Sequence, residues 1–80
     1  MSKNWVPLTT LAPGQVGVVY GLAGGARFRS RMATLGFTPG ARLTMLQNFG
    51  HGPLIVNIRD TRIALGRGEA AKVLVEKASQ

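Results

Sequence analysis

Hydrophobic and polar residues alternate along this chain with two different periods, which divide it into short elements. Alternation with period two is typical of β-strands. It predicts strands over residues 16–22, around Leu43 and Met45, over a hairpin segment at 54–66, and over 72–77. Phe28, Met32 and Leu35 instead lie at i, i+4 and i+7, on one face of a helix with about 3.6 residues per turn. The pattern therefore predicts about five short strands and one helix, from about Ala26 to Leu35, between the first two strands.

The first predicted strand carries large side chains on one side and glycines on the other. The large side chains are Val16, Val18, Tyr20 and Leu22, and the glycines are Gly17 and Gly21. Because glycine inside a strand often marks a bulge or a bend, we expect a small and strongly curved sheet.

The hairpin segment has one register that pairs its apolar residues. With Asp60-Thr61 as a two-residue tip, Ile58 faces Ile63 and Val56 faces Leu65. After this hairpin, the segment GRGEAA predicts a helical turn before the last strand.

Glycines mark the turns and the end of the helix. Pro-Gly pairs at 13–14 and 39–40 fit the middle of type II turns, where glycine supplies the positive φ. Gly36 fits the left-handed position that closes a helix, and Phe37 would then pack back on Met32. We expect three glycines to have structural roles of this kind: Gly14, Gly36 and Gly40.

Short strands in a chain of 80 residues indicate a mainly β protein with a small closed barrel. The chain is too short for a β-sandwich, and no linker or low-complexity segment divides it. We therefore expect a single domain over residues 1–80, with a core from about 7 to 75, built as a five-stranded barrel with one short α-helix.

The composition argues against an enzyme or a metal site. The chain has no cysteine, one histidine and three acidic residues, whereas structural zinc sites need about four ligands. His51 stands between two glycines, where we expect exposure, and it has no acidic residue near it in sequence to act as a catalytic partner. The segment GLAGGAR lacks the residues of a phosphate-binding loop. We expect no catalytic residues, no metal ligands and no cofactor.

The formal charge of +7 is large for this length and indicates an acidic partner. Nucleic acid, an anionic membrane surface and an acidic protein face are all consistent with it. No apolar run approaches the roughly 20 residues that a transmembrane helix needs, and no signal-peptide core follows the N-terminus. The expectation is a soluble intracellular domain.

Three arginines alternate in the predicted helix. Arg27 and Arg31 lie on nearly the same side of it, and Arg29 lies roughly opposite, so that they bracket the apolar face. A helix that reads DNA would direct its basic residues to one exposed face. The spacing favours solvated arginines whose stems cover apolar surface, or a contact with protein or lipid. If the helix is only scaffold, Arg59 and Arg62 beside the hairpin tip are the next candidates for a partner surface.

Binding of single-stranded RNA is an alternative, because small barrels can combine basic grooves with exposed aromatic rings. The available rings are few, and we expect at least three of them in the core. They are Trp5, Tyr20, Phe28, Phe37 and Phe49.

Three segments together resemble the FeoA family, from about Pro7 to Val75. PLTTLAPGQVGVVYGLAG is similar to its opening, with a leucine pair, a Pro-Gly and a strand. RFRSRMATLGFTPGARLTML looks like its core pattern, an arginine-containing helix followed by Leu-Gly-hydrophobic, Pro-Gly and a strand. GPLIVNIRDTRIALGRGEAAKVLV is similar to its ending, a Gly-Pro loop, a hairpin, Ala-Leu-Gly-Arg and a last strand.

The resemblance implies an SH3-like barrel in the bacterial cytoplasm and a non-enzymatic accessory role in ferrous iron uptake. It implies as partner the membrane transporter FeoB, which carries a cytoplasmic GTPase domain and would recruit the chain to the inner membrane. It leaves open whether the chain activates, restrains or only assembles the transporter, and in which oligomeric state. The partner-binding candidates are Arg27, Arg29, Arg31, Arg59 and Arg62; no nucleic acid is expected. A nucleic-acid-binding module and a free-standing metal carrier are the alternatives.

Overall fold

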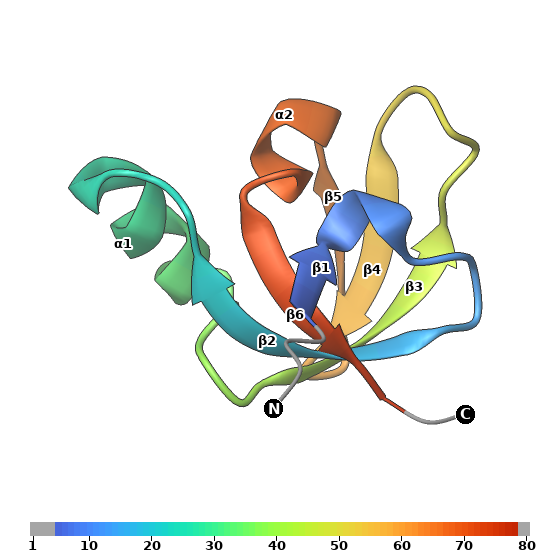
Figure 1. The fold of residues 1–80 in the computed structure, drawn as a ribbon, viewed down its shortest axis with the longest axis horizontal. Coiled ribbons are helices and arrows are strands. Elements are labelled where there is room, and N and C mark those ends of the chain that lie inside the picture. The colour runs from blue at the N-terminus through green and yellow to red at the C-terminus, as the bar shows by residue number, and fades with distance from the viewer. Residues whose placement is uncertain (1–4, 79–80) are drawn as a thin grey trace.

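The computed structural model describes residues 5–78, and these fold into one antiparallel sheet with a helix at its side (Figure 1). The strands follow the order β1-β6-β2-β3-β4-β5 across the sheet. Their bounds are β1 Trp5–Pro7, β2 Val16–Leu22, β3 Arg42–Gln47, β4 Leu54–Ile58, β5 Thr61–Leu65 and β6 Val73–Lys77. The helices are η1 Leu8–Thr10, α1 Ala26–Thr34 and α2 Arg67–Ala70.

The mainly β fold is confirmed, but the sheet is not the closed five-stranded barrel that the sequence predicts. A sixth strand, β1, pairs only with β6, and β1 and β5 form the two edges of an open sheet in the described residues. β1 was missed because three residues are too few to display a period. Pro7 suits this place, since proline cannot donate a ladder hydrogen bond and is tolerated on edge strands.

β2 is curved by a bulge, as its glycines indicate. The register with β6 shifts between Val19 and Gly21, which leaves Tyr20 as the extra residue. The core-facing side of β2 carries Gly17 and Val19, which are buried, whereas Tyr20 is exposed. Val16, Val18 and Tyr20 thus lie on the outer side, whereas Leu22, which follows the bulge, packs against the core.

The β4–β5 hairpin forms with a register different from the predicted one. Val56 pairs with Ile63, and the tip is Arg59-Asp60, both at positive φ (52° and 61°). This is the backbone of a type I′ turn, which matches the twist of a hairpin. A tip at Asp60-Thr61 would place a β-branched residue at positive φ, where its side chain clashes. The shift between the two registers is two residues, so the same side chains still face the core.

α1 ends as the sequence predicts. Gly36 has φ +105° and donates its N–H to the Ala33 carbonyl at 3.0 Å, while the Phe37 N–H reaches the Met32 carbonyl at 3.0 Å. These two bonds define a Schellman motif. Phe37 and Met32 are both fully buried in the core.

The two Pro-Gly turns are also present. Gln15 donates its N–H to the Ala12 carbonyl and Ala41 donates to the Thr38 carbonyl, and Gly14 and Gly40 have φ +90° and +91°. Both are therefore type II turns.

The core lies inside the curve of the sheet and is entirely apolar among the described residues. It takes side chains from η1, α1 and five of the strands. Its largest buried side chains are Leu8, Leu11, Met32, Phe37, Leu43, Met45, Leu54, Ile58 and Leu65.

Candidate functional site

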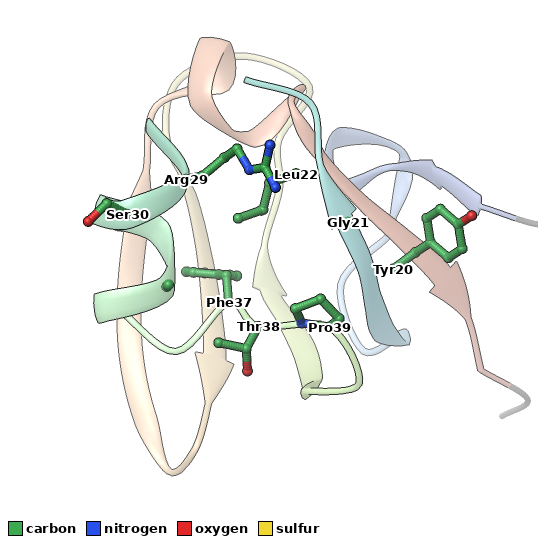
Figure 2. Close-up of a pocket in the computed structure, with 9 residues that line it drawn as sticks. Tyr20, Gly21, Leu22, Arg29, Ser30, Phe37, Thr38 and Pro39 are labelled. Atoms are coloured by element: carbon green, nitrogen blue, oxygen red, sulfur yellow. The ribbon is translucent and has the colours of Figure 1, made fainter. Parts of the chain in front are cut away.

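A groove of about 570 Å³ lies between α1 and the second half of β2 (Figure 2). One wall is Tyr20–Leu22 of β2 and the other is the α1 face with Arg29, Ser30 and Ala33. Phe37, Thr38 and Pro39 line it where the chain leaves α1 toward β3. Arg29 is the one charged residue among these nine, and none of them is acidic. The groove therefore combines apolar surface with a positive charge.

Arg29 is placed over this groove by the packing of its helix. Met32 anchors α1 in the core with no exposed surface, and Arg29, three residues before it, lies on the neighbouring face of the helix and is exposed. Figure 2 shows the Arg29 side chain extending from α1 toward Leu22. No carboxylate pairs with Arg29 among the described residues, because their one ion pair joins Arg31 and Glu69.

The other two helix arginines differ from Arg29. Arg31 forms its ion pair with Glu69 and so ties α1 to α2. Arg27 is exposed and does not line the groove. Phe28 is only half-buried, with the Lys72 ammonium 5.2 Å from its ring centroid, and Leu35 is half-buried as well. The apolar stripe is therefore buried mainly at Met32.

The hairpin arginines also have separate surroundings. Arg59 donates a hydrogen bond from its guanidinium to Thr38 Oγ1 at 3.2 Å, which brings the hairpin tip to one end of the groove. Its side chain also covers Gly36, where an added Cβ would lie 3.1 Å from Arg59 Cδ. Arg62 is exposed on β5, opposite Asn57. Of the predicted arginines, Arg29 and Arg59 are the two that reach the groove or one of its lining residues.

Sequence reasoning missed a polar cluster around Asn48. The Asn48 amide donates to the carbonyls of Thr9 and Leu11 at 3.0 and 2.7 Å, and its oxygen accepts from Gly50 N–H and from Arg67 at 3.1 and 3.0 Å. Arg67 also donates to the Gly52 carbonyl at 3.1 Å. The cluster holds η1, the loop after β3 and α2 together. The Ala-Leu-Gly-Arg segment, which ends at Arg67, was the sequence signal that could have revealed this cluster. The hydrogen bonds of Arg67 show that its role is structural.

The expectation that at least three aromatic rings lie in the core is wrong. Only Phe37 is fully buried, while Tyr20 is 51% and Phe49 is 70% exposed. Trp5 stacks on Tyr20 with ring centroids 4.4 Å apart and an interplanar angle of 10°. The outward side of the bulge and the loop after β3 present these rings, because neither position faces the interior.

The described residues offer little for catalysis or metal binding. No group of three or more histidine, cysteine or acidic side chains gathers among residues 5–78. His51 is exposed in its loop, as expected. In the same part of the chain no helix has the length and apolarity that crossing a bilayer requires.

Six short antiparallel strands with a lateral helix define the class: a small SH3-like domain. Comparison with known proteins identifies it further. The chain belongs to the FeoA domain family, which matches residues 6–77. This family consists of small accessory domains and is not a known family of enzymes.

Individual relatives agree with this assignment. A Methanocaldococcus jannaschii protein, proposed to be an Fe(2+) transport protein A, is 32% identical over 72 residues, or 90% of this chain and 87% of that protein. The crystal structure of an iron uptake regulatory protein (FeoA) has a TM-score of 0.88 and 36% identity, covering 92% of this chain and 99% of the other. FeoA of Stenotrophomonas maltophilia, crystallised with zinc, has a TM-score of 0.77 and 31% identity, covering 86% and 87%. That protein is described as a prokaryotic SH3 domain proposed to activate ferrous iron transport.

The same fold occurs in transcriptional repressors, one of which is named as manganese-dependent. IdeR of T. acidophilum has a TM-score of 0.85 at 15% identity, covering 98% of this chain but 36% of the repressor. At this identity the likeness concerns the fold alone.

Proposed function

We propose that this chain is an accessory protein of ferrous iron uptake that acts by contact with the cytoplasmic GTPase domain of a FeoB-type transporter. The observation that carries the proposal is membership of the FeoA family over residues 6–77. Relatives named for Fe(2+) transport and for iron uptake regulation support a role in this process. The contact would occur on the cytoplasmic side of the inner membrane.

Two features of the surface support action by contact rather than by chemistry. The described residues gather no metal-ligating cluster. They also carry arginines without carboxylate partners, among them Arg29 beside an open groove. Arginine is enriched in protein interfaces, and charges at an interface rim mainly set the association rate and its dependence on salt.

Co-purification tests the contact. The tagged chain should retain the cytoplasmic domain of the transporter encoded in the same genome, and Arg29→Glu should weaken this retention while leaving the fold intact. Lys77→Glu is the control, because it changes the charge equally on exposed β6 surface outside the groove. No retention by the wild-type chain at low and physiological salt would contradict the proposal.

GTP hydrolysis by the transporter, measured with and without this chain, separates two modes of action. A changed turnover would mean that the chain regulates the GTPase domain. Unchanged turnover with intact retention would mean that it braces the transporter assembly.

A further inference from the structure

β2 has an open edge along the groove. The β2–β3 ladder covers Val16–Val18, and two further bonds join Val19 to the chain before β3, its N–H to the Ala41 carbonyl and its carbonyl to the Gly40 N–H, each 2.8 Å. β2 nevertheless continues to Leu22, paired there only with β6. Beyond Val19 the place beside β2 that β3 would occupy is open, because the chain before Gly40 comes from α1.

The backbone of Leu22 is directed to this open side. The Ala23 N–H donates to the Lys72 carbonyl at 2.8 Å, toward the β6 side. Consecutive strand residues direct their N–H and C=O groups to opposite sides, so those of Leu22 point away from β6. Within residues 5–78, Tyr20–Leu22 make no backbone hydrogen bond outside the ladders. A strand edge of this kind is a template for another chain.

The groove beside this edge has the shape and composition that suit an extended peptide. α1 forms the far wall, and Leu22 and Pro39 give an apolar surface for alternate side chains. Arg29 extends toward Leu22 (Figure 2). Arg59 donates a hydrogen bond to Thr38 at the other end. Strand addition to an exposed edge draws its affinity from main-chain bonds and its specificity from pockets for alternate side chains.

We propose that this groove binds an extended acidic segment of a partner protein, which adds to β2 as a short strand along Tyr20–Leu22. Apolar side chains of the segment pack on Leu22 and Pro39, and a carboxylate pairs with Arg29. The inference rests on the proposed function in that the segment belongs to a protein partner, but the groove's preference can be measured without that partner.

Nucleic acid and membrane fit this groove less well. Single-stranded RNA is held by exposed ring faces, whereas Phe37 has no exposed surface and Tyr20 already stacks on Trp5. A bilayer surface cannot enter a groove between a helix and a strand. An extended chain can.

A titration of the ¹⁵N-labelled full chain, followed by NMR, tests the proposal with defined probes. The probe is acetyl-Val-Glu-Leu-Glu-Val-amide, in which apolar and acidic side chains alternate as in a strand. It should shift the amides of Tyr20–Leu22 and of α1 with a Kd at or below about 1 mM, and Arg29→Glu should weaken binding at least about fivefold. Lys77→Glu should leave it within about twofold, as expected for an exposed charge. The counterpart with lysine in place of glutamate should not bind.

N-methylated probes test the strand pairing itself. A methyl group on the central leucine and one on the following glutamate remove N–H groups that face opposite edges of the peptide. One of the two peptides should lose binding and the other should retain it. An equal effect of both would overturn strand addition.

The proposal is also overturned if the acidic peptide does not bind, if the lysine peptide binds equally, or if oligouridylate binds this groove more tightly at physiological salt. Loss of partner retention in Arg29→Glu without peptide binding would leave the proposed function standing and this inference wrong. If the chain binds the peptide but retains no transporter domain, the inference about the groove stands and the proposed function is wrong.

Discussion

Gly36 combines a positive φ with a close side-chain neighbour. Its φ of +105° lies in the region that L side chains rarely adopt, and Arg59 Cδ would stand 3.1 Å from an added Cβ. Gly36→Val should therefore lower the stability by on the order of 1 kcal/mol or more. For a domain of this size each kcal/mol corresponds to about 4–8 °C in melting temperature.

Gly68→Ala is the control for this substitution. Gly68 lies in α2 with open space around its Cα, so alanine should preserve or raise the melting temperature. An unchanged melting curve for Gly36→Val would contradict the Schellman cap.

The hairpin tip makes a second prediction at the residue scale. Asp60 has φ 61° at the second position of a type I′ turn, where glycine is preferred. Asp60→Gly should therefore raise the melting temperature by a few degrees. Thr61→Gly should lower the stability by roughly 0.5–1 kcal/mol, because Thr61 is the first residue of β5 and glycine weakens a strand. A higher melting temperature for Thr61→Gly would instead indicate a tip at Asp60-Thr61, where Thr61 would have positive φ.

At the scale of elements, Asn48 connects three segments that have few other links. Asn48→Ala leaves the Thr9 and Leu11 carbonyls without their amide donor and removes an acceptor from Arg67. The expected cost is roughly 1–3 kcal/mol of unfolding free energy for groups that are part-buried. Denaturant unfolding measures it.

Asn57→Ala is the matched truncation. Asn57 is half-buried in β4, and its side chain makes no hydrogen bond within residues 5–78. Its loss should change the stability by no more than about 0.5 kcal/mol. Equal costs for the two variants would mean that the Asn48 cluster does not hold the loop.

Elements with strong local patterns were predictable from the sequence. α1 and its cap follow from the apolar spacing and from Gly36. The Pro-Gly turns follow from the φ values that proline and glycine favour at the two central positions of a type II turn. The hairpin register did not follow, because two registers place the same apolar residues on one face and only the φ requirement of the tip separates them. β1 did not follow either, since its three residues are held by pairing with β6 rather than by a pattern of their own.

The candidate site was predictable only in part. The arginine spacing was consistent with solvated arginines or with a contact surface. It did not indicate that Arg31 would pair with Glu69, which lies far away in sequence. The open edge of β2 could not be predicted, because it depends on the point at which the β2–β3 pairing ends while β2 continues. Tertiary pairing of this kind leaves no local signal.

At the scale of the whole molecule, the chain is a small curved sheet that presents a basic groove and belongs to the FeoA family. We propose that it supports ferrous iron uptake through a protein contact made by this groove. That claim assigns the function to a surface, so a single change of charge at Arg29 should remove it while the fold persists.

Uptake of radiolabelled ferrous iron is the most direct measurement. Cells lacking the chain are complemented at equal abundance with the wild type, with Arg29→Glu or with Lys77→Glu. We expect that the wild type and Lys77→Glu restore uptake and that Arg29→Glu does not. Full restoration by Arg29→Glu, or undiminished uptake in cells that lack the chain, would contradict the proposal.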